Sequence, residues 1–174
     1  MTKLDITQKI CYVLNIITRI IMYVSFIVSA LLLVFLLITF LINTANAFGL
    51  MDKPEDLIES QAYIAVAIIN IFAAGIFSKY ISNYFKKELS DGTPFIQESA
   101  VMLRSVGIKG IILHVISAVL SLIVLLIFHF VANLTNYNLD FNFEGTGTLG
   151  LSITFIALSI ILEAGCEEIK KIKE

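Results

Sequence analysis

Four polar side chains on one apolar segment are the residues of this sequence whose types and spacing best fit a chemical role. His114, Ser117, Ser121 and His129 lie in an uncharged stretch, and on a helix they fall within about 60° either side of one line. Such a line inside a membrane could conduct protons or ions, or it could form hydrogen bonds with neighbouring helices. Because no acidic residue lies at mid-depth to complete a proton relay, hydrogen bonding is the favoured interpretation.

The other reactive residues form no recognisable catalytic or metal-binding pattern. Two histidines without a carboxylate or thiolate at ligand spacing make a poor metal site. Cys11 and Cys166 are far apart in the sequence, and there is no phosphate-binding loop, nucleophile elbow, zinc-peptidase motif or Cys-x-x-Cys pair. We therefore expect no enzymatic activity, no cofactor and no metal site.

The segments that carry these residues are expected to cross a membrane. Charged residues make up 15% of the 174 residues and hydrophobic residues 58%, and the mean hydropathy is +0.92. The near-neutral balance of 12 basic and 14 acidic residues argues against direct nucleic-acid binding. Since roughly 20 apolar residues cross the hydrocarbon, the uncharged stretches predict four spans, at about 20–42, 61–78, 110–131 and 149–163. We predict a single integral membrane domain over 1–174, an all-α antiparallel bundle of four transmembrane helices.

The placement of basic residues predicts the orientation of this bundle. All 12 basic residues except Lys53 precede the first span, lie between the second and third, or follow the fourth. Because basic residues concentrate on the cytoplasmic side, we expect a cell-membrane protein with both termini and the segment 79–109 in the cytoplasm. Cys11 and Cys166 then lie on the reducing side as free thiols.

The segment 79–109 is predicted to form a helical hairpin on the cytoplasmic side. Gly92 can end its first helix, and Pro94 suits the first turn of its second. Helices of about 61–89 and 94–132 would be roughly 44 and 58 Å long, more than the hydrocarbon thickness of about 30 Å. The hairpin is therefore expected to extend past the headgroups.

An alternative is a bend at Gly107 or Gly110 that lays the second helix of the hairpin flat in the interface. In either case, neighbouring segments are expected to pack beside the hairpin. These segments are the tail 167–172 and the N-terminal leader, through Ile10, Val13, Leu14 and Ile17.

Further polar residues are expected to pack or pair within the bundle. Asn70 is the residue that we expect to form a buried hydrogen bond between helices. Glu163 is expected to pair with Arg19, Arg104 or Lys109, unless these side chains simply extend to water. Small residues also recur at intervals that let helices approach closely: Cys11, Thr18, Ser25 and Ser29, and Asn70, Ala74 and Ser78.

Four short motifs lie around the hairpin and at the end of the fourth span: Gly92-Thr93-Pro94-Phe95, Leu103-Arg104-Ser105-Val106-Gly107, Leu158-Ser159 and Glu163-Ala164-Gly165-Cys166-Glu167. Together they resemble a family of small bacterial integral membrane proteins, domain-of-unknown-function family 2975. The sequence departs from that family at Ile160, where an acidic residue is expected, and in its short tail. The family has no established activity. The resemblance implies a membrane-bound sensor or modulator whose partner is a small helix-turn-helix regulator.

The expected function is that of a non-enzymatic modulator. The hairpin tip (Gly92, Pro94 and Phe95) would contact a cytoplasmic protein, with Arg104 and Glu163 holding the hairpin in place. Two alternatives are open, a small permease or channel formed by several copies of the chain around the polar line, and a bacteriocin-immunity type protein. Besides such partners, the lipid bilayer itself surrounds the spans.

Overall fold

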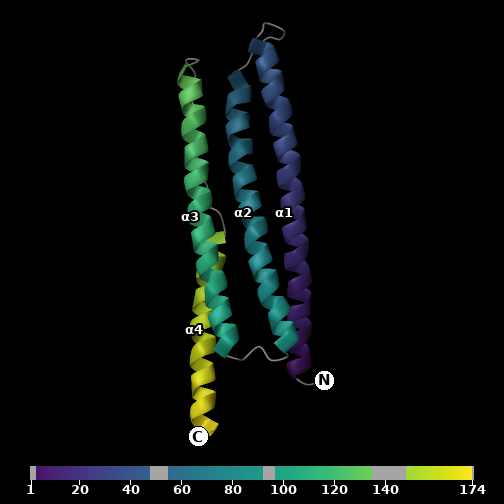
Figure 1. The fold of residues 1–174 in the computed structure, drawn as a ribbon, viewed down its shortest axis with the longest axis vertical. Coiled ribbons are helices and arrows are strands. Elements are labelled where there is room, and N and C mark those ends of the chain that lie inside the picture. The colour runs from purple at the N-terminus through teal and green to yellow at the C-terminus, as the bar shows by residue number, and fades with distance from the viewer. Residues whose placement is uncertain (1–2, 48–54, 92–96, 135–147, 174) are drawn as a thin grey trace. The chain divides into compact units, whose positions relative to one another are not determined.

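In the computed structural model the described residues, 3–47, 55–91, 97–134 and 148–173, all lie in helices (Figure 1). There are four of these: α1 (Lys3–Ala47), α2 (Glu55–Asp91), α3 (Gln97–Leu134) and α4 (Thr148–Lys173). The prediction of an all-helical chain with four long apolar helices is confirmed. The predicted hairpin tip, Gly92, Pro94 and Phe95, lies outside the described residues.

Each helix contains a segment that is long and apolar enough to cross a membrane. These segments are Ile6–Ile42, Ser60–Ser90, Gln97–Val131 and Leu149–Glu168. By length and composition the chain is therefore a multi-pass membrane protein. Helices α2 and α3 also continue beyond the predicted spans, as the hairpin prediction requires, with α2 ending at Asp91 and α3 beginning at Gln97.

The chain divides into two compact units. Unit 1 consists of Met1–Val24, Ala74–His114 and Thr146–Glu174, and unit 2 consists of Ser25–Ala73 and Val115–Gly145. Unit 1 thus contains the beginning of α1, the end of α2, the beginning of α3 and the whole of α4. Unit 2 contains the remaining parts of α1, α2 and α3.

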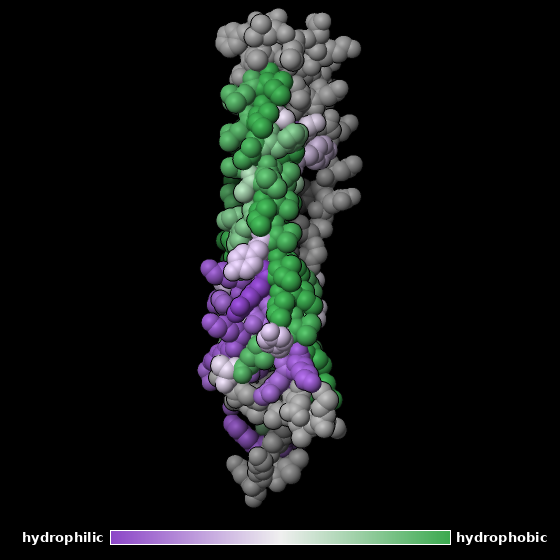
Figure 2. Space-filling model, turned by 90° about the vertical axis from the view of Figure 1, so that its right-hand side faces the viewer, coloured by the Kyte–Doolittle hydropathy of each residue, from purple (hydrophilic) through white to green (hydrophobic). Residues whose placement is uncertain are grey.

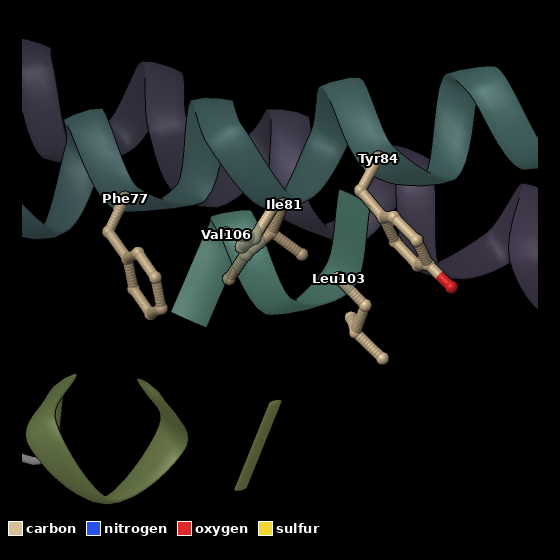
Figure 3. Packing of buried hydrophobic residues seen from close by; sticks show 5 residues of the cluster. All are labelled: Phe77, Ile81, Tyr84, Leu103 and Val106. Carbon is tan, nitrogen blue, oxygen red and sulfur yellow. The ribbon is translucent and has the colours of Figure 1, made fainter. Parts of the chain in front are cut away.

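Unit 1 has a core of large apolar side chains. Phe77, Ile81 and Tyr84 of α2 meet Leu103 and Val106 of α3 in one buried cluster (Figure 3). Helix α4 closes this cluster with the partly buried Phe155 and Leu162, and the ring of Phe155 lies 6.1 Å from that of Phe77, centroid to centroid. The core therefore joins three helices in the part of the chain that carries most of the charges.

The interior of unit 2 is different, because small hydroxyl side chains fill much of it. Ser25, Ser29 and Thr39 of α1 are buried, as are Ser117 and Ser121 of α3. Large apolar side chains instead face outward, and Figure 2 shows them covering the outer surface of α1. Small residues inside and large apolar residues outside are typical of helices that pack within lipid.

The N-terminal leader packs beside the hairpin, as expected, but through a different face. The leader is the first part of α1, and its Asn15 is bonded to Ser82 of the hairpin, whereas Ile10, Val13, Leu14 and Ile17 are exposed. The face of α1 that turns inward in unit 1 carries the half-buried Cys11 and Thr18 and the buried Asn15. Helix α1 thus packs in its own chain through small and polar residues, and its large aliphatic residues stay on the outside.

Candidate functional site

Helices α3 and α4 are joined by an ion pair in unit 1. The guanidinium of Arg104 contacts the carboxylate of Glu163, which confirms the prediction that Glu163 pairs with one of three basic residues. Both side chains are half-buried, so water screens the pair only in part. Towards the ends of the same helices, Lys170 donates a hydrogen bond of 2.9 Å to the side-chain oxygen of Gln97. The tail of the chain therefore contacts the hairpin, as expected.

Two glycines let α3 and α4 approach closely. A Cβ atom at Gly107 would lie 2.8 Å from the backbone oxygen of Ser152 and 2.6 Å from Cγ1 of Ile156. A Cβ atom at Gly110 would overlap the ring of Phe77 and the hydroxyl of Ser152. Helix α3 continues through both positions. The role of these glycines in the structure is close packing, in place of the bend considered from the sequence.

Helices α2 and α3 are joined on the outside of unit 1 by two cation contacts. Lys87 forms an ion pair with Glu98, and the ammonium of Lys109 lies 5.4 Å from the centroid of the Tyr80 ring. An exposed ion pair and an exposed cation–π contact each contribute on the order of 1 kcal/mol or less. These contacts fix the relative register of the two helices more than they stabilise them.

Helices α1 and α2 are joined by a buried hydrogen bond that was not anticipated from the sequence. The hydroxyl of Ser82 donates to the side-chain oxygen of Asn15 over 2.8 Å, and both residues are buried. A signal for this contact was present, because Asn15 lies four residues after Cys11 and three before Thr18, on the face already singled out by its small residues. The hydrogen bond expected from Asn70 is not the one found, since Asn70 is only half-buried.

A buried carboxylate lies within the hairpin part of α2. Glu88 is buried, and the hydroxyl of Tyr84, one turn earlier, donates a hydrogen bond to its carboxylate. Glu88 was not among the residues singled out from the sequence. A carboxylate that is inside the protein needs such donors, so this contact ties the polar end of α2 to the apolar core beside it.

The polar line of α3 turns away from the exposed surface along its whole length. Ser117 and Ser121 are buried, and His114 and His129 are half-buried. The hydroxyl of Ser121 has no hydrogen-bond partner among the described residues. Arg19, in contrast, is exposed on α1, and within the described ranges no three His, Cys, Asp or Glu residues come together as a metal site would require.

The comparisons with known proteins add no relative. No protein-family model, curated protein or solved structure matches this chain. The resemblance to family 2975 and the function that it implies therefore stay predictions.

Proposed function

We propose that this chain is a non-enzymatic membrane protein that acts on a soluble protein partner through the cytoplasmic side of its bundle. The observation that carries the proposal is the concentration of inter-helix contacts in unit 1. There a buried apolar cluster, two ion pairs and the Asn15–Ser82 hydrogen bond hold parts of all four helices together. A rigid set of helix ends of this kind is suited to present a fixed surface to a partner.

The order of the contacts supports the antiparallel arrangement. Lys87 near the end of α2 contacts Glu98 at the beginning of α3, while Tyr80, two turns earlier in α2, contacts Lys109, which is three turns later in α3. Residue numbers therefore fall along one helix as they rise along the other. Helices α3 and α4 follow the same rule, because Gln97 contacts Lys170 and Arg104 contacts Glu163.

A group of basic residues supports the placement of unit 1 on the cytoplasmic side. The contact between Asn15 and Ser82 brings Arg19, one turn further on in α1, level with Lys79 in α2. Lys109 lies beside Tyr80, next to Lys79, and Arg104 is five residues nearer the beginning of α3. We call these four residues the basic band: Arg19, Lys79, Arg104 and Lys109. Long basic side chains at one level are typical of the boundary between hydrocarbon and cytoplasm.

The hairpin is long enough to reach the cytosol from this boundary. Beyond Lys79, α2 continues to Asp91, and before Lys109, α3 begins at Gln97, which is 12 residues in each helix. At 1.5 Å per residue these extensions are about 18 Å long, whereas the headgroup region is only about 5–8 Å thick on each side. The connection between the two helices is therefore expected to lie in water, where a soluble protein can contact it.

Crosslinking in cells tests this proposal. A photoreactive residue in place of Phe95 is expected to capture one dominant soluble protein, identified by mass spectrometry, and a helix-turn-helix regulator would agree with the family resemblance. A matched control carries the same residue at Phe40, an exposed phenylalanine of α1 near the end of the first predicted span that is farther from the cytoplasm, and should capture no cytosolic protein. The protein captured in this way should co-purify with the wild-type chain without crosslinking, and the variant Phe95→Asp should lose this co-purification at unchanged membrane abundance. Unchanged co-purification with Phe95→Asp, or the same crosslinked products from positions 95 and 40, would contradict the proposal.

A permease or channel is the second candidate, and the polar line of α3 favours it. Ser117 and Ser121 are buried in unit 2, and a hydroxyl inside a membrane bundle is either a packing contact or part of a polar path. Liposomes that contain the purified chain can distinguish the two. Equal ion or proton flux for the wild type and for a variant with alanine at His114, Ser121 and His129 would remove the basis of this candidate.

A further inference from the structure

Arg19 and Lys79 differ from the other two residues of the basic band. Arg104 forms its ion pair with α4, and Lys109 forms its cation–π contact with α2. Arg19 and Lys79 are exposed, and neither forms an ion pair with another of the described residues. Their two charged groups are therefore accessible to a ligand from outside the protein.

The neighbouring turns of each helix also leave these two charges without a counter-charge. On a helix, a side chain contacts the residues three and four positions away. For Arg19 these are Asn15, Ile16, Met22 and Tyr23, and for Lys79 they are Gly75, Ile76, Ser82 and Asn83. None of them is acidic, so neither charge is compensated within its own helix.

Arg19 and Lys79 lie on the same side of the contact between α1 and α2. The hydrogen bond from Ser82 to Asn15 marks this contact. Arg19, four residues after Asn15, is displaced by about 40° around α1, and Lys79, three residues before Ser82, is displaced by about 60° around α2. The two displacements have the same sense about each chain direction. In the antiparallel arrangement proposed above, displacements of the same sense lead to the same side of the pair of helices.

This side faces out of unit 1. Thr18 and Ser78 hold the corresponding positions on the other side of the same contact, and they are half-buried and buried. Arg19 and Lys79 are both exposed. Figure 2 shows strongly hydrophilic side chains gathered along one side of the apolar surface of α1. Two positive charges from neighbouring helices thus meet at one outer edge of the bundle.

The edge lies at the level where lipid headgroups are expected. Arg19 and Lys79 belong to the basic band, which we placed at the boundary between hydrocarbon and cytoplasm, and the site described here rests on that part of the proposed function. Tyr23 lies one turn after Arg19, inside the predicted span, and is 61% exposed. Tyrosine side chains at this depth typically lie among the headgroups, with the ring towards the hydrocarbon and the hydroxyl towards water.

We infer that Arg19 and Lys79 bind the phosphate of an anionic lipid headgroup. The guanidinium of Arg19 can donate to two oxygens of one phosphate, while the ammonium of Lys79 adds a second positive charge from the neighbouring helix. A lipid with a net negative charge is favoured over a zwitterionic one, because the ammonium of a zwitterionic headgroup would bring a third positive charge to the edge. The acyl chains then lie against the apolar surface that α1 exposes further along the span.

Lipid titration of the purified full-length chain tests the site. Native mass spectrometry from detergent counts the lipids bound to each chain, with phosphatidylglycerol as the anionic probe and phosphatidylcholine as the zwitterionic one. The first phosphatidylglycerol is expected to bind roughly tenfold more tightly than the first phosphatidylcholine, because two basic residues contribute to it. The double variant Arg19→Gln and Lys79→Gln should lose this preference. Each single variant should lose part of it, which keeps the test valid if the double variant does not fold.

The matched control is the double variant Lys9→Gln and Lys86→Gln. It removes the same charge from the same two helices, at exposed positions that lie ten and seven residues from Arg19 and Lys79 on the cytoplasmic side. It should keep the preference for phosphatidylglycerol, and circular dichroism should show the same helix content for both double variants.

Three outcomes would overturn the inference. Equal affinity of the wild type for the two lipids would exclude recognition of an anionic headgroup. Equal losses in the two double variants would show that the positive charge attracts lipid without a localised site. Displacement of phosphatidylglycerol by millimolar inorganic phosphate would identify a free anion, in place of a lipid, as the occupant. The titration contains no protein partner, so its result is separate from that of the capture experiment at position 95.

Discussion

A methyl group added at Gly107 is expected to separate α3 from α4. The new Cβ would lie 2.8 Å from the backbone oxygen of Ser152 and 3.1 Å from the backbone nitrogen of Ile156. Because backbone atoms cannot rotate away, the two helices must move apart by several tenths of an ångström. Overpacking of this kind typically costs about 1–3 kcal/mol, whereas the gain in helix propensity from Gly to Ala is roughly 1 kcal/mol. We therefore expect Gly107→Ala to lower the free energy of unfolding by up to about 2 kcal/mol.

The matched control is Gly165→Ala, in the same unit but on the other side of α4. A Cβ atom there would meet nothing within 4 Å, so this variant should keep the propensity gain of up to about 1 kcal/mol. Unfolding is measured in mixed micelles with increasing sodium dodecyl sulfate, and circular dichroism is the suitable signal because the chain has no tryptophan. The two variants should differ by about 1–3 kcal/mol. If Gly107→Ala unfolds at the same detergent fraction as Gly165→Ala, α3 and α4 do not pack as described.

Two further contacts in unit 1 give predictions in the same assay. A double-mutant cycle with Arg104→Gln and Glu163→Gln should give a coupling energy of about 1 kcal/mol, because both side chains are half-buried. Added salt should weaken this coupling. The more exposed pair of Lys87 and Glu98, between α2 and α3, should give less than about 0.5 kcal/mol. Ser82→Ala should cost about 1–3 kcal/mol, since it leaves the buried side-chain oxygen of Asn15 without its donor. Asn83→Ala, at the exposed position next to it, should change the stability by less than about 0.5 kcal/mol, and equal losses for the two variants would contradict the buried bond.

The elements of the fold followed from signals that are strong at the level of single segments. Long uncharged stretches predict helices of membrane-spanning length, and α1 to α4 contain them. The continuation of α2 beyond its span, predicted to about residue 89 and observed to Asp91, followed from a helical pattern that is unbroken before Gly92. The pairing of Glu163 was predictable because an acidic residue at the end of an apolar span has few partners, and the basic residues near it were known. Which of these basic residues contacts Glu163 could not be predicted, because that depends on the register of α3 against α4, and the structure shows that it is Arg104.

The orientation of each helix about its own axis was harder to predict. In a soluble helix the apolar face marks the inside, and by that rule Ile10 and Val13 were expected to pack against the hairpin. Helix α1 is apolar on nearly all sides, so hydrophobicity gives no direction. The small and polar residues do, because Asn15, Ser25 and Ser29 all turn inward. Depth in a span was a poor guide to buried hydrogen bonds, because Asn70 at mid-depth is only half-buried, whereas Asn15, before the predicted span, forms the buried bond with Ser82.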